Sequence, residues 1–159
     1  ALPTACALLG SERPPILAAS AQLVALLCAT RSGRGALVTL QGSPLHSLSE
    51  LISHDDATVR AAVLHVLVRL SEDPAACPAL QRTAAVQGAL DLIECERVQH
   101  PEATTDPSPS GPPLQVALQV LKNLVRHDGG LSGLLREHPA IEDLDLGWTA
   151  GPPQEQTAG

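Results

Sequence analysis

The sequence predicts an all-α fold, a right-handed superhelical solenoid of about three stacked helical repeats. The first reason is composition: apolar residues make up 44% of the 159 residues, yet there is one Trp and no Phe or Tyr. Sandwiches and barrels usually pack their strands with aromatic side chains, so a core of Leu, Ala, Val and Ile favours helices. The second reason is an internal repeat of apolar segments at helical spacing.

Three long segments, residues 16–27, 59–70 and 113–124, align with one another without gaps. In each segment apolar residues recur every three positions, as on one stripe of a helix. The segments are offset by 43 and then 54 residues, and removing an inserted loop brings both offsets close to the roughly 40–47 residues of common helical repeats. The aligned apolar positions are Ala21, Leu64 and Leu118; Val24, Leu67 and Leu121; and Leu27, Leu70 and Leu124.

A shorter amphipathic segment precedes each long one, at residues 4–9, 44–52 and 84–93. Because a helix pair of this size cannot cover its own apolar face, neighbouring pairs are expected to stack. The predicted unit is therefore a short helix, a turn, a long helix and a connector. In the connector after the first long helix, Gly33 and Gly35 are expected to end that helix.

The turn before the second long segment contains His54, Asp55 and Asp56. A carboxylate at a helix start accepts hydrogen bonds from the first backbone N–H groups, so we expect this turn to supply the N-cap. Acid–base chemistry by the same three side chains is the alternative interpretation.

The helical repeats are predicted to span residues 1–144, interrupted by a Pro- and Ser-rich loop at 98–113. Ser108 precedes a proline in that loop and is a candidate phosphorylation site, with a plain linker as the alternative. A disordered C-terminal tail is predicted at 145–159. Its Trp148 is interpreted as a cap on the last helix pair or as part of an acidic-hydrophobic motif for a partner.

The stretch His-Asp-Asp-Ala-Thr-Val-Arg-Ala-Ala-Val-Leu-His-Val-Leu-Val-Arg-Leu, residues 54–70, resembles the armadillo family, whose long third helix follows an acidic turn. It is similar to a HEAT repeat as well. The resemblance covers roughly residues 4–144 and implies that the long helices line a concave groove that binds a protein. Many armadillo repeats place a Trp and, four residues later, an Asn in that groove. The corresponding positions here hold Gln22 and Leu26, His65 and Arg69, and Gln119 and Asn123.

We call these six residues the polar row, and only Asn123 matches the residue type of the family. A spacing of four keeps each pair on one helical face. Amide and guanidinium groups there could bond the backbone or carboxylates of a partner. An ordinary solvated helix face is the alternative. The missing Trp residues argue against importin-like capture of basic peptides.

Several function classes are disfavoured by charge and motifs. The formal charge is −7 with scattered basic residues, which argues against nucleic acid and anionic membranes as partners. The most apolar run, residues 16–29, is too short to span a bilayer. No nucleophile or phosphate-binding motif is present, and Cys95 with His100 lacks the second ligand pair of a metal site. We therefore expect no catalysis, no metal and no cofactor.

The four cysteines form no Cys-x-x-Cys pair, so we expect reduced, mostly buried thiols in an intracellular protein of the cytoplasm, the nucleus or both. The function favoured by the sequence is a protein-protein interaction scaffold with a peptide or domain partner on its concave face. The alternative is a C-terminal structural cap or regulatory segment of a longer repeat protein, including one with an upstream catalytic domain. In either case we expect the chain to pack on preceding repeats.

Overall fold

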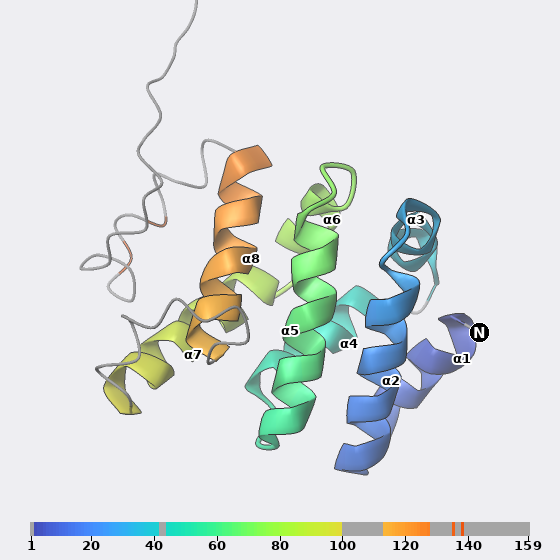
Figure 1. Ribbon diagram of the computed structural model, residues 1–159, viewed down its shortest axis with the longest axis horizontal. Helices are drawn as coiled ribbons and strands as arrows, with labels where there is room; N and C mark the ends of the chain where they lie inside the picture. Colours follow the sequence, from blue (N-terminus) through green and yellow to red (C-terminus); the bar gives the residue numbers. More distant parts are fainter. Residues whose placement is uncertain (1, 42–43, 100–112, 128–134, 136–137, 139–159) are drawn as a thin grey trace, which may run out of the picture.

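The computed structural model describes residues 2–41, 44–99, 113–127, 135 and 138, and all regular secondary structure within them is helical (Figure 1). Three long helices lie side by side: α2 (Pro14–Leu27), α5 (Ala57–Ser71) and α8 (Pro113–His127), with α5 between the other two. The all-α prediction is therefore confirmed for this part of the chain. Among these residues no helix is both long and apolar enough to cross a membrane.

A second layer of helices lies behind the long ones. α1 packs on α2, and η2, the continuation of α4, packs on α5, while α7 contacts both α8 and α4. Two further helices, α3 and α6, lie in the connections that follow α2 and α5 (Figure 1). The bounds of these elements are α1 Leu2–Ala7, η1 Leu8–Gly10, α3 Arg31–Thr39, α4 Pro44–Glu50, η2 Leu51–Ser53, α6 Cys77–Gln81 and α7 Ala85–Gln99.

The elements of the first half recur with a constant spacing. The 3-10 helices begin at Leu8 and Leu51, and the long helices α2 and α5 begin at Pro14 and Ala57, so both pairs are 43 residues apart. Even the backbone bond that ends each 3-10 helix repeats, because the N–H groups of Ser11 and His54 donate to the carbonyls of Leu8 and Leu51. The spacing predicted from the sequence is thus present in the helix bounds.

Local sequence explains where the long helices begin. α2 starts with two prolines, which are tolerated in the first turn because its N–H groups have no partner within the helix. α5 starts after Asp56, whose carboxylate accepts bonds from the N–H groups of Thr58 at 2.8 Å and Val59 at 3.2 Å. The N-cap predicted for this turn is confirmed.

The connector after α2 differs from the expectation. Gly33 and Gly35 do not end α2 but lie within α3, which Thr30 caps by accepting a bond from the Gly33 N–H at 3.0 Å. A Cβ at Gly33 would overlap the backbone carbonyl of Leu27, whereas a Cβ at Gly35 would meet nothing within 4 Å. Gly33 is therefore needed for the close approach of two helices and not for a terminating turn.

The predicted loop at 98–113 is shorter at both ends in the structure. α7 continues through Val98 and Gln99, and α8 already begins at Pro113. The segment expected as a short helix at 84–93 is thus as long as α5. Residues 100–112, with Ser108 and His100, lie outside the described residues, as do the tail at 145–159 and Trp148.

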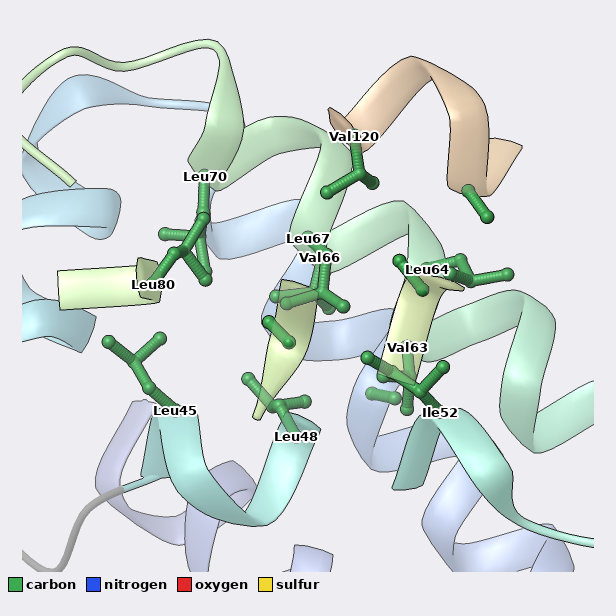
Figure 2. Close-up of a cluster of buried hydrophobic side chains, with 14 of the residues drawn as sticks. Leu45, Leu48, Ile52, Val63, Leu64, Val66, Leu67, Leu70, Leu80 and Val120 are labelled. Atoms are coloured by element: carbon green, nitrogen blue, oxygen red, sulfur yellow. The ribbon is translucent and has the colours of Figure 1, made fainter. Parts of the chain in front are cut away.

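The core fills the space between the two layers (Figure 2). Leu48 and Ile52, from α4 and η2, are fully buried, as are Val63 and Leu67 of α5. Burial of each such side chain stabilises the fold by about 1.5–3 kcal/mol before entropy is counted. A core of Leu, Val, Ile and Ala needs no aromatic residue, which agrees with the composition.

Candidate binding groove

An open groove of about 760 Å³ runs across the surface of the three long helices. Since its lining comes from α2, α5 and α8, the groove exists only where these helices are held side by side. Residues from all three helices line it: Gln22, Ala25, Leu26 and, just past the end of α2, Ala29; Ala62, His65, Val68 and Arg69; and Gln115, Val116 and Gln119.

Five of the six residues of the polar row line this groove. All five are exposed. Leu26, the one apolar residue among them, is 72% exposed. The row was chosen by carrying the groove positions of the armadillo family onto the repeat alignment, and the side-by-side packing of α2, α5 and α8 brings five of its residues to one surface.

Asn123, the sixth residue of the row, lies elsewhere. It is only 2% exposed, its amide nitrogen donates to the Ser71 hydroxyl at 3.0 Å, and its amide oxygen accepts from Gln119 at 2.8 Å. The reason is that Asn123 shares a flank of α8 with the buried Val120, and this flank faces α5. Its amide therefore joins two helices and is not part of the groove lining.

The floor of the groove is made of small apolar side chains that the sequence analysis did not single out. Ala62 is 3% exposed, and Ala25, Val68 and Val116 are half-buried. The repeat alignment contained a signal for this floor, because Ala25 and Val68 occupy the same aligned position, directly before Leu26 and Arg69. Polar side chains thus rim a shallow apolar floor.

The groove lining carries little charge, and that charge is positive. Among the described residues that line it, Arg69 is the only one with a permanent charge, and no carboxylate is present. The Arg69 guanidinium lies 4.0 Å from Glu72, with the two side chains 55% and 47% exposed. Such an exposed pair is weak, so the guanidinium can exchange this partner for another carboxylate. His65 adds an exposed imidazole on the same helix.

The described part of the chain contains possible metal ligands and four cysteines without a disulfide. No three His, Cys, Asp or Glu side chains gather there as metal ligands. Cys28 and Cys77 are buried, whereas Cys95 is exposed. Burial, followed by the proximity of Cys6, raises the pKa of the Cys28 thiol to about 11, so this thiol is protonated and unreactive at neutral pH.

The described chain is therefore an all-helical protein with two layers of helices and an open groove over its long helices. No protein-family model and no curated protein matches the sequence. Among solved structures, the fold is similar to the crystal structure of an engineered protein, a target of the Northeast Structural Genomics Consortium, with a TM-score of 0.62 and 14% sequence identity. The match covers 89% of this chain but 57% of the engineered one, and at this identity the likeness concerns the fold alone.

Proposed function

We propose that the chain is a non-catalytic interaction scaffold that binds a partner peptide or domain in the groove over α2, α5 and α8. The observation that carries this proposal is the convergence of five polar-row residues, the counterparts of armadillo groove positions, on one open groove with an apolar floor. An ordinary solvated helix face would not combine exposed amides with a hollow lined by Ala62, Val68 and Val116.

The lining suits an extended polypeptide. Gln22, His65 and Gln119 stand on three neighbouring helices, so donors and acceptors recur along the groove as they do along an extended backbone. Small apolar residues beneath them leave room for the partner's side chains. Arg69 then favours a partner that brings a carboxylate to the middle helix.

We also propose that the fold is a right-handed solenoid of armadillo-like repeats in an intracellular protein. The spacing of 43 residues between equivalent helices and the row of three long helices support this architecture. A further recurrence supports it: the Arg34 guanidinium donates to the Cys28 carbonyl at 3.0 Å, and the Cys77 thiol donates to the Ser71 carbonyl at 3.4 Å. The two donors, Arg34 and Cys77, are 43 residues apart, and so are the two carbonyl residues, Cys28 and Ser71.

Selection of short peptides on the intact chain, followed by affinity measurements with two charge-reversal variants, tests the function. Arg69→Glu removes the charged group of the groove, and Arg82→Glu makes the same change at an exposed position outside it. A charge-assisted hydrogen bond is worth about 1.5–3 kcal/mol, so Arg69→Glu is expected to weaken binding at least about tenfold.

Arg82→Glu is expected to leave the affinity unchanged, and circular dichroism must show the same helicity for all three proteins. The groove is refuted as the binding site if the selected peptides bind Arg69→Glu as tightly as the parent chain while both variants are folded.

A further inference from the structure

One flank of α2, the flank turned away from α5, carries exposed apolar side chains. Helical geometry places Ala19, Leu23 and Leu26 along it, at spacings of four and three residues. We call these three residues the free flank of α2. The repeat alignment gives each of them a counterpart in the next two long helices: Ala62, Val66 and Arg69 in α5, and Val116, Val120 and Asn123 in α8.

Burial differs sharply between these counterparts. Leu23 is 42% exposed, whereas Val66 and Val120 at the same repeat position are 0% exposed. Ala19 is exposed, whereas Ala62 is buried. In α5 and α8 this flank is the one that packs on the preceding long helix, whereas α2 packs on α5, α1 and η1 and has no preceding long helix within the described residues.

The third position gives direct evidence of which neighbour this flank meets. In α8 it holds Asn123, whose amide donates to Ser71 at the end of the preceding helix, α5. In α2 it holds Leu26, which is 72% exposed, and in α5 it holds Arg69, whose side chain is 55% exposed, so the contrast in burial rests on the positions of Ala19 and Leu23. Two of the four large apolar side chains exposed in the described residues thus lie on the free flank, and a third, Leu8, belongs to η1, which packs on α2. Contiguous exposed apolar surface marks an interaction site.

We propose that the free flank of α2 is the docking surface for a preceding helical unit of the same polypeptide, whose long helix lies beside α2 as α2 lies beside α5. The argument is continuity with an established interface, because the packing of α2 on α5 and of α5 on α8 is repeated once more at the same register. The inference does not rest on the proposed function, although Leu26 also belongs to the groove lining.

The occupant is not a second copy stacked head to tail. Such a copy would present the outer flank of its α8, where Lys122 replaces the Ala25 and Val68 of the two other long helices. A lysine in that position would bring an ammonium group against the apolar flank, which costs desolvation. A preceding unit with a small apolar residue at this position meets no such cost.

Thiol labelling in the natural full-length protein tests the proposal directly. With the exposed Cys95 replaced by Ser, Leu23→Cys and Val98→Cys each place one thiol at a position that is exposed in the structure. In the full-length protein a maleimide is expected to label position 23 at least about tenfold more slowly than position 98, because docking must open first. In the present chain both are expected to react at similar rates. Equal rates in the full-length protein would overturn the proposal.

A fusion tests the same surface by stability. Placing a duplicate of residues 44–86 directly before Ala1 continues the 43-residue spacing and supplies a second copy of α4, α5 and α6. Leu23→Gln is expected to lower the melting temperature of this extended chain by about 4 °C or more but to change the present chain by less than about 1 °C. Val98→Gln is the control in both. Two separate unfolding transitions, or equal effects of Leu23→Gln in both chains, would contradict docking. Sedimentation in which Leu23→Gln converts a dimer of the present chain into a monomer would replace the proposed occupant by a second copy.

Discussion

Replacement of Asn123 by Ala measures how strongly α8 is held to α5. The variant loses a fully buried hydrogen bond to Ser71 and a partly buried one from Gln119. Ser71 keeps a partner for its own hydroxyl, which donates to the Val68 carbonyl at 2.8 Å, so no buried donor is left without an acceptor. The expected loss is therefore about 1–2 kcal/mol, at the lower end of the range for a buried polar pair.

Urea denaturation followed by circular dichroism gives this free energy of unfolding. With an m-value of about 1–3 kcal/mol/M, the midpoint of Asn123→Ala is expected to fall by roughly 0.5–1 M. Gln115→Ala is the matched control, since it removes an amide from the groove side of the same helix and should cost less than about 0.5 kcal/mol. The double variant with Ser71→Ala and Asn123→Ala should lose less free energy of unfolding than the sum of the losses in the two single variants. Equal midpoints for Asn123→Ala and Gln115→Ala would refute the assignment of Asn123 to the helix interface.

Three further predictions concern the connector after α2 and the buried thiol. Gly33→Ala is expected to destabilise the chain by several kcal/mol, because the new Cβ would overlap the carbonyl at the end of α2. Gly35→Ala is expected to be neutral or stabilising by up to about 1 kcal/mol, because its Cβ would meet no other atom. A similar melting temperature for the two variants would contradict this. The hydrogen bond from Arg34 lowers the pKa of the Asp73 carboxyl in the folded chain. The Asp73 carboxylate therefore stabilises the fold at pH values above the ordinary Asp pKa of about 3.9, and this contribution is lost as the pH falls through the lowered pKa. Asp73→Asn should therefore be less stable than the parent at pH 7 and approach it near pH 3 in urea titrations, and a difference independent of pH would argue against the pair. Burial of Cys28 predicts that a disulfide reagent modifies it at neutral pH only on unfolding, and rapid modification of the folded chain would exclude its place in the core.

The long helices could be predicted because their apolar register is a local property of the sequence. The three aligned segments place Val24, Leu67 and Leu121 at one position, and all three are buried. The repeat alignment, with the groove positions of the armadillo family carried onto it, also predicted five residues that lie on one surface. It failed at Asn123, because register fixes the side of a helix on which a residue lies but not how far the neighbouring helix covers that side.

The connector was mispredicted for a different reason. Glycine near the end of an apolar segment most often ends a helix, and Gly33 satisfies that pattern. Here Gly33 lies in the first turn of α3, where Thr30 accepts its N–H and where a Cβ would overlap the Leu27 carbonyl. The glycine pattern alone does not show that the chain starts a new helix at this turn. The apolar floor of the groove was missed similarly, since Ala25 and Val68 have no distinguishing chemistry until three helices are placed side by side.

The bond that closes the ends of α2 and α5 is made by unlike residues, a guanidinium at Arg34 and a thiol at Cys77. Both are hydrogen-bond donors that reach a carbonyl six residues earlier in the chain. Either donor can therefore satisfy the carbonyl, so the two positions match in hydrogen-bond geometry although their residues differ. Matching donor and carbonyl positions thus adds evidence for a degenerate repeat to the apolar register that the sequence carries.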